Sequence, residues 1–181
     1  MTVIVNLYGS SGSGKSTTAM GLTYFLKLKG YKVEYVTEYA KDLVNEGSQH
    51  KLKYQLSIFS EQLRKVHILL DKGLDFIITD SPLLLGVFYD KKYKNNTPYL
   101  EEVCYSYYNS FLNFDVFLKR VVPFDPALRI QTEEESDEDS IVLERYLAKT
   151  VSLDMMVDYK ENRVENIMKN LLINSKKDFP L

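Results

Sequence analysis

The sequence predicts an α/β fold built around a mainly parallel sheet. Short apolar runs typical of strands alternate along the chain with longer segments of helical periodicity, which is the order that βαβ units require. A glycine-rich loop stands between the first strand-like run and the first helix-like segment. The composition, with 45% hydrophobic and 27% charged residues, is that of an ordinary globular protein. The length of 181 residues suits one domain spanning residues 1–181.

Strand-like apolar runs predict the strands of this sheet. The first run is β-branched and is closed by Gly9, and the second alternates between apolar and polar residues. The third run ends at Asp80. The predicted strands span residues 3–8, 31–37, 75–79, 115–118 and about 152–157. Because helix-like segments separate these runs, we expect right-handed crossovers between parallel strands.

The helices are predicted from the spacing of their apolar residues. In the segment 54–71, Leu56, Phe59 and Leu63 fall on one face with the period of an α-helix. The first helix is followed by Gly30, a residue typical of helix C-termini. The predicted helices span residues 15–29, 38–45, 54–71, 99–111, 141–149 and 161–173. Each lies between two predicted strands or follows the last one.

Several classes of protein are excluded by the composition. Cys104 is the single cysteine, so an intramolecular disulfide is impossible, and we expect a reducing cytoplasm. No apolar run is long enough to cross a bilayer, and the N-terminal apolar stretch lacks the basic residues of a signal peptide. We therefore expect no membrane partner. The net charge of −2 argues against an extended nucleic-acid-binding surface.

The glycine-rich loop fits the phosphate-binding pattern G-x-x-x-x-G-K-[ST] at every fixed position. Glycines allow backbone N–H groups to approach phosphates, and the following helix adds its positive end. Lys15 has the reach to contact the β- and γ-phosphates, and the Ser16 hydroxyl has the place of a Mg²⁺ ligand. A flexible Gly/Ser turn is the alternative, but a buried strand precedes this motif and a helix follows it. The loop therefore predicts binding of a nucleotide with Mg²⁺, and the residues that would bind it are Gly9, Ser11, Gly12, Ser13, Gly14, Lys15, Ser16 and Thr17.

Two carboxylates follow predicted strands, at the edge where ligands of parallel sheets bind. Asp80 comes after the apolar run 76–79, as the acid of a Mg²⁺-binding strand does. Its alternative role is to cap the turn at Ser81–Pro82. Glu38 follows the second strand and is a candidate for the base that accepts a proton from an acceptor hydroxyl. Its alternative role is that of an acid favoured at a helix start.

A polar stretch follows the fourth predicted strand, and residues of about 120–140 have the length of a lid over a phosphate site. Arg129 is the candidate for contacting the transferred phosphoryl group, and Arg120 is the second candidate. Both arginines are alternatively surface residues in ion pairs. The acidic run 133–139 favours a solvated helix start over a metal site, because acids stabilise the first turn of a helix.

An aromatic-rich segment lies after Asp80. Its rings either stack on a nucleobase-like acceptor or pack in the core; they are Phe88, Tyr89, Tyr93, Tyr99, Tyr105, Tyr107 and Tyr108. The basic stretch 91–94 within this segment either contacts phosphates of a nucleotide or of DNA, or forms a solvated loop, which we favour.

The order GSSGSGKST, VTEYAKDLV, FIITDSP and FDVFLKR with a downstream arginine resembles the P-loop nucleoside and nucleotide kinases. The nearest likeness is to the ribosylnicotinamide kinase domain of the bacterial NAD-biosynthesis regulator and to related small phage P-loop kinases. This resemblance implies a five-stranded parallel core with helices on both faces, MgATP as phosphoryl donor, and a hydroxyl acceptor near the second and third strands. It also implies that Glu38 and Asp80 are acceptor-side or magnesium-side carboxylates and Arg129 the lid arginine. Deoxynucleoside kinases carry a further arginine where this chain has Ser81.

These observations predict an ATP-dependent kinase with catalytic residues Lys15, Glu38, Asp80 and Arg129, acting on a nucleoside or nucleotide-like acceptor. Ser16 and Asp80 are the predicted Mg²⁺ ligands. Two alternatives stay open: a DNA kinase that acts on a modified base or a 5′ end, and a P-loop ATPase or regulatory switch. Nothing in the sequence specifies an oligomeric state.

Overall fold

The computed structural model describes residues 1–126 and 129–175, and its centre is a five-stranded sheet. All paired strands are parallel and lie in the order β2-β3-β1-β4-β5. Their bounds are β1 (Val3–Tyr8), β2 (Val33–Val36), β3 (Phe76–Thr79), β4 (Leu112–Leu118) and β5 (Met155–Val157). The predicted α/β class and the five-stranded parallel sheet are therefore confirmed.

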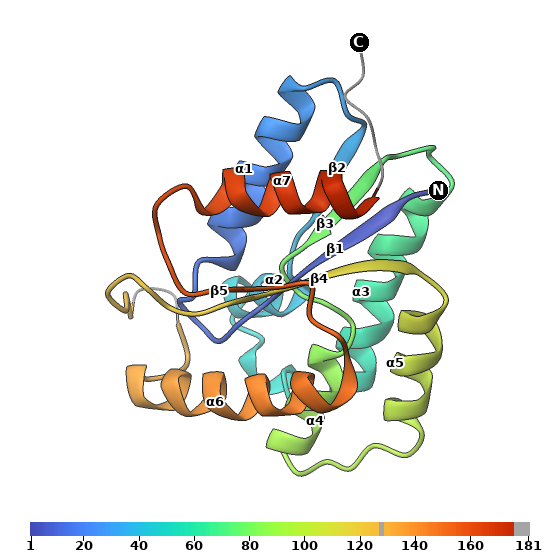
Figure 1. Cartoon of the computed structure of the whole chain (residues 1–181). Helices are drawn as coiled ribbons and strands as arrows, with labels where there is room; N and C mark the ends of the chain where they lie inside the picture. The colour runs from blue at the N-terminus through green and yellow to red at the C-terminus, as the bar shows by residue number, and fades with distance from the viewer. Residues whose placement is uncertain (127–128, 176–181) are drawn as a thin grey trace.

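Helices cover both faces of this sheet (Figure 1). α1 and α7 pack on one face, whereas α3, α4, α5 and α6 pack on the other. The bounds are α1 (Lys15–Leu28), α2 (Tyr39–Asn45), the 3₁₀ helix η1 (Gln49–Lys51), α3 (Gln55–Leu70), α4 (Leu85–Lys92), α5 (Leu100–Asn109), α6 (Glu133–Thr150) and α7 (Arg163–Ser175). Within the described residues, no helix combines the length and apolar character needed to span a membrane.

The strand β1 lies in the centre of the sheet and is buried along its whole length. Val3 aligns with Phe76 of β3 on one side and with Leu112 of β4 on the other. On the far side of β3, Val36 aligns with Thr79. Because the strands run parallel and end in step, the residues that follow them meet at one edge.

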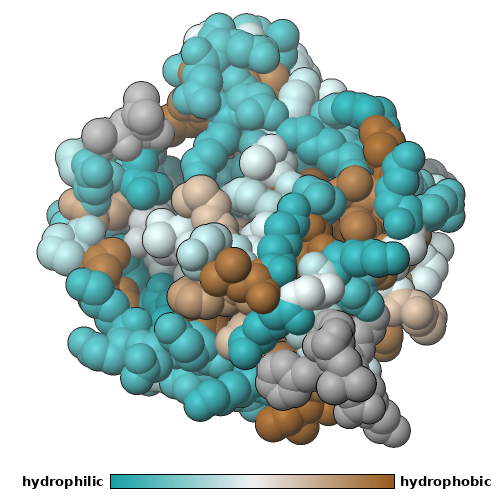
Figure 2. Space-filling view, turned by 90° about the horizontal axis from the view of Figure 1, so that it is seen from above, coloured by the Kyte–Doolittle hydropathy of each residue, from teal (hydrophilic) through white to brown (hydrophobic). Residues whose placement is uncertain are grey.

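Apolar clusters on both faces fix the helices on the sheet. On one face, Leu22 and Leu26 of α1 and Leu171 of α7 are buried against the strands. On the other face, Phe59 and Leu63 of α3 belong to a second cluster, so the predicted helical stripe is the buried side of this helix. The surface viewed from above α1 and α7 is mainly hydrophilic with interspersed hydrophobic residues (Figure 2). The burial thus follows the periodicity of the sequence.

Some elements differ from their predicted bounds. α6 begins at Glu133 instead of Ile141, because Thr132 and Glu135 form a reciprocal capping box and acids occupy the first turn. This confirms that the acidic run is a helix start. β4 begins at Leu112 instead of Asp115, and α4 was not predicted as a separate helix. Of the predicted lid at 120–140, residues 127–128 lie outside the described residues.

Candidate functional site

The phosphate-binding loop follows β1 and leads into α1, as the motif requires. The φ angles of Gly9 and Gly14 are 148° and 87°, in the region that favours glycine. A Cβ atom on Gly9 would lie 2.5 Å from the carbonyl oxygen of Leu118, so a side chain has no space there. These glycines let the chain turn tightly between strand and helix, so that the loop backbone encloses a concave surface.

The Lys15 side chain folds back over this loop. Its Nζ atom donates hydrogen bonds to the carbonyl oxygens of Gly9 and Ser10, at 2.8 and 2.9 Å. Burial lowers the pKa of the Lys15 ammonium, whereas the nearby carboxylates of Glu38 and Asp80 raise it. The ammonium therefore lies at the mouth of the loop, next to the carboxylates that the sequence also placed at the site.

Asp80 and Ser16 lie next to each other at the ends of β3 and the loop. The Ser16 hydroxyl donates to Oδ2 of Asp80 at 2.5 Å, and the Tyr35 hydroxyl donates to the same oxygen at 2.6 Å. Asp80 is fully buried, and its Oδ1 atom has no hydrogen-bond partner within the described residues. A buried carboxylate oxygen without a partner, beside a serine hydroxyl, fits a Mg²⁺ ion, which prefers oxygen ligands and retains several waters.

Glu38 immediately precedes α2, and its side chain makes no capping hydrogen bond with the helix. Burial raises the pKa of its carboxyl, and the positive charge of Lys15 opposes this shift. One turn further along α2, Lys41 donates from Nζ to the Ser16 hydroxyl at 2.6 Å. Glu38 and Lys41 therefore both line the pocket beside the phosphate-binding loop, because the i,i+3 spacing places them on the same side of the chain.

The two candidate arginines have different surroundings. Arg129 donates from Nη1 to the Ser11 hydroxyl at 3.0 Å and lines the pocket at the loop. Arg120 instead forms ion pairs with Glu133 and Asp137 at the start of α6. The geometry thus brings Arg129 to the phosphate site and holds Arg120 against α6.

α6 itself contacts the phosphate-binding loop. The buried Ser136 hydroxyl donates to the carbonyl oxygen of Ser11 at 2.6 Å and lies 3.1 Å from the Ser10 hydroxyl. Ser136 is in the first turns of the helix, so the capping of α6 at Thr132 also fixes this contact. The predicted lid region, residues 120–140, is therefore hydrogen-bonded through Ser136 to the phosphate-binding loop.

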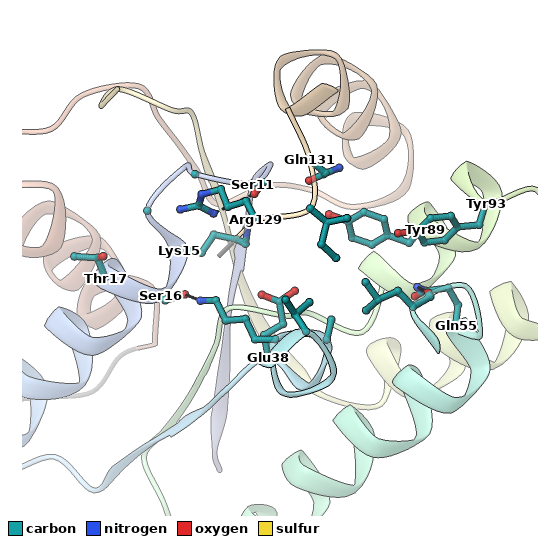
Figure 3. Close-up of a pocket in the computed structure, with 17 residues that line it drawn as sticks. Ser11, Lys15, Ser16, Thr17, Glu38, Gln55, Tyr89, Tyr93, Arg129 and Gln131 are labelled. Atoms are coloured by element: carbon teal, nitrogen blue, oxygen red, sulfur yellow. Dashed lines mark hydrogen bonds between the residues drawn. The ribbon is translucent and has the colours of Figure 1, made fainter. Parts of the chain in front are cut away.

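A pocket of about 290 Å³ lies between these elements. Figure 3 shows Lys15, Ser16 and Arg129 on one side, Tyr89, Tyr93 and Gln55 on the other, and Glu38 between them. The Tyr89 and Tyr93 rings are stacked, with centroids 6.3 Å apart and planes 26° apart. The lining residues are Ser11, Gly12, Gly14, Lys15, Ser16, Thr17, Glu38, Ala40, Lys41, Val44, Leu52, Gln55, Tyr89, Tyr93, Arg129, Ile130 and Gln131. The pocket therefore has a cationic end and an aromatic, uncharged end.

A family model described as an AAA domain matches residues 4–153. The chain belongs to the AAA domain family. The phosphate-binding loop and the parallel sheet agree with this family, so the AAA domain protein has a nucleotide-binding P-loop fold.

Two solved structures are similar to this AAA domain protein. The crystal structure of APE1195 is 20% identical with a TM-score of 0.46, over 96% of this chain and 94% of that chain. The structure of the Mycobacterium tuberculosis APS kinase CysC, in complex with AMPPNP and APS, is 17% identical with a TM-score of 0.47, over 93% of this chain and 96% of that chain. No curated protein matches the sequence.

The aromatic-rich segment of this AAA domain protein divides between site and core. Tyr89 and Tyr93 line the pocket, whereas Phe88 is buried in the core and the hydroxyls of Tyr105 and Tyr146 lie 3.0 Å apart. Burial, followed by the charge of Glu38, raises the pKa of Tyr89, so its hydroxyl stays protonated as a hydrogen-bond donor. Core packing therefore accounts for Phe88, whereas stacking of Tyr89 and Tyr93 on an acceptor stays a prediction.

The basic stretch of the AAA domain protein faces acidic partners. Lys91 forms an ion pair with Glu101 at 2.8 Å, and Lys92 forms one with Asp139 at 2.6 Å. Ammonium groups that are already paired with carboxylates gain less from a phosphate. This pairing favours the structural interpretation of residues 91–92 over a nucleic-acid contact.

Several residues at this site were absent from the predicted set. Three of them line the pocket, namely Lys41, Gln55 and Gln131. The fourth is Tyr35, whose hydroxyl donates to the Asp80 carboxylate. The i,i+3 spacing from Glu38 was a signal for Lys41. The sequence carries no comparable signal for Gln55 and Gln131, because only the packing of α3 and α6 brings them to the pocket.

Proposed function

We propose that the protein is an ATP-dependent kinase that transfers the γ-phosphoryl group of MgATP to a hydroxyl of a small nucleoside-like acceptor. The observation that carries this proposal is the position of Glu38 in one pocket, between the cationic end and the aromatic end. A kinase needs a subsite for its acceptor beside the phosphates, and the aromatic end of the pocket offers one. A base between two such subsites suits proton removal from an acceptor.

Each end of the pocket has a separate role in this proposal. The loop N–H groups and Lys15 would hold the β- and γ-phosphates, and Ser16 and Asp80 would hold Mg²⁺. When bound, Mg²⁺ neutralises phosphate charge and orients the γ-phosphoryl group. Tyr89 and Tyr93 would hold the ring of the acceptor by stacking. The cations among the described lining residues are Lys15, Lys41 and Arg129, all at the loop end, which favours an uncharged acceptor over a nucleotide.

The chemical step needs a group that takes the acceptor proton. The acceptor oxygen forms a bond to the γ-phosphorus, the bond from that phosphorus to the bridging oxygen breaks, and ADP leaves. The proton passes to the Glu38 carboxylate, whose raised pKa makes it a better base than an exposed glutamate. Arg129 and Lys41, which contact Ser11 and Ser16 of the loop, would stabilise the negative charge that spreads over the transferred oxygens.

The test is a panel of nucleosides, nucleotides and oligonucleotides, incubated with γ-labelled ATP and scored for labelled product. The resemblance to ribosylnicotinamide kinases puts the nicotinamide nucleoside on this panel. We expect label on a nucleoside and transfer by Lys15→Ala that is at least about a hundredfold slower. Transfer by Glu38→Gln should be about 10²–10⁴-fold slower at unchanged ATP affinity. Label on oligonucleotides would identify a DNA kinase, and acceptor-independent release of phosphate would identify an ATPase; either result would overturn the proposal.

A further inference from the structure

The first residue of α7 reaches the phosphate-binding loop from outside the pocket. The Arg163 guanidinium donates from Nη1 to the carbonyl oxygen of Ser13 at 3.0 Å and from Nη2 to that of Lys119 at 3.2 Å. Its Nε atom donates to the carbonyl oxygen of Tyr159 at 3.0 Å. The guanidinium therefore connects the loop, the end of β4 and the segment after β5. α7 lies beyond residues 4–153, the span that the AAA domain model matches.

The charge of Arg163 has no carboxylate partner within the described residues. Its three hydrogen-bond acceptors are backbone carbonyl oxygens. The side chain is partly buried, and this burial lowers the pKa of the guanidinium, which nevertheless stays charged because arginine starts from so high a value. A partly buried cation without an anion is costly in a folded protein. A polyphosphate in the adjacent loop would supply the missing negative charge.

The contact with Ser13 also fixes a peptide orientation. The described peptide bonds contain no cis bond, so the Ser13 carbonyl and the Gly14 N–H point in opposite directions. Arg163 holds this carbonyl on the outer side of the loop, and a Cβ atom on Gly14 would lie 3.1 Å from Nη1. Gly14 lines the pocket on its other side. Its N–H group is therefore directed away from Arg163, toward the space that a phosphate would occupy.

We propose that Arg163 is a positioning residue of the nucleotide site, which orients the Ser13–Gly14 peptide toward the phosphates and adds positive charge behind it. The proposal rests on the nucleotide-binding part of the proposed function and is independent of the acceptor. Preorganised N–H donors and fixed charges act on a polyphosphate without reorganisation on binding. The C-terminal helix thereby becomes part of the phosphate site, although it contributes no residue to the pocket lining.

The test compares Arg163→Met and Arg163→Lys with a control, Lys169→Met. Lys169 is exposed on the same helix, so the control removes one positive charge without a contact to the loop. Binding of ATP and of inorganic tripolyphosphate is measured by calorimetry, with the melting temperature measured without ligand. We expect Arg163→Met to weaken both ligands about tenfold, which corresponds to about 1.4 kcal/mol. Arg163→Lys should recover part of this loss, because it keeps the charge, and the control should bind as the wild type does.

The outcomes separate this proposal from the proposed function. If the wild type binds neither ATP nor tripolyphosphate, the proposed function fails. If the wild type binds both and Arg163→Met binds equally well with only a lower melting temperature, Arg163 is structural and this inference is wrong. Should Arg163→Met not fold, Arg163→Lys decides the question. If Arg163→Lys binds tripolyphosphate with wild-type affinity and an unchanged salt dependence, the contacts of the guanidinium with the Ser13 and Lys119 carbonyls have no role in binding, and the inference is wrong.

Discussion

Glu38 combines a buried position with the chemistry of a base. Because burial raises the pKa of its carboxyl, we expect the rate of transfer to rise with pH through a value above 4.5, the ordinary pKa of this group. Below that value the carboxyl is protonated and no longer accepts the acceptor proton. The measurement is the pH profile of kcat for the wild type. A profile that is flat from pH 4 to 8 would contradict the role of Glu38.

The raised pKa of Glu38 also predicts how the stability of the protein depends on pH. The folded protein holds the Glu38 proton more tightly than the unfolded chain does, so this group contributes stability at low pH and loses it as pH rises through the folded pKa. Glu38→Gln should therefore melt at the same or a higher temperature than the wild type at pH 7, with a smaller advantage at pH 4. A lower melting temperature at pH 7 with normal catalysis would instead identify Glu38 as a helix-start residue.

Asp80 is expected to act through its unpaired oxygen. Asp80→Asn keeps the shape of the side chain but removes the charge beside Ser16, so the Mg²⁺ concentration for half-maximal rate should rise and turnover should fall. The measurement is a Mg²⁺ titration at saturating ATP. Asn caps turns nearly as well as Asp, so an unchanged titration would favour the turn-capping role.

Some residues of this site could be predicted from the sequence, and others could not. The loop 9–17 follows from a local motif, and Glu38 and Asp80 follow from their positions after strands, since parallel strands end at one edge. Arg163 could not be predicted, because its contact with Ser13 joins residues 150 positions apart. Such a contact depends on the order of strands in the sheet and on the packing of α7 against α1, which local patterns do not encode.

Among the elements, α6 is the helix whose N-terminal capping box is expected to contribute measurably to the stability of the protein. The Thr132 hydroxyl accepts from the Glu135 N–H at 3.2 Å, and the Glu135 carboxylate accepts from the Thr132 N–H at 2.9 Å. Thr132→Ala should lower the free energy of unfolding by about 0.5–2 kcal/mol. The measurement is urea denaturation, with Thr150→Ala at the other end of α6 as control. Equal losses in both variants would contradict a specific role of the cap.

Element boundaries were predicted best where one face is buried. α3 shows its buried stripe in the sequence, and its predicted and observed bounds differ little. The first turns of α6 are acidic and mostly exposed, so they lack the apolar period that marks a helix, although their capping residues were visible. The segment containing α4 is almost continuously buried, and a run that is apolar on all sides does not reveal its period.

At the scale of the molecule, the phosphate-binding loop connects the central strand β1 to α1, which packs one face on the sheet, so nucleotide binding should stabilise the whole fold. With MgATP at a hundred times its Kd, the free energy of unfolding should rise by about 2.7 kcal/mol. Lys15→Ala should lose most of this gain and slow transfer at least about a hundredfold. Thermal melting with and without MgATP measures the gain. An equal shift in both proteins would contradict the role of Lys15.

Asp139 of α6 accepts hydrogen bonds from Lys92 of α4 and from Gln131, which lines the pocket two residues after Arg129. One carboxylate thus connects the helix that carries Tyr89 to the segment that carries Arg129. An acceptor that shifts α4 would also displace the arginine at the phosphates. Linkage then makes the coupling reciprocal: any factor by which the acceptor tightens ATP binding is the factor by which ATP tightens acceptor binding.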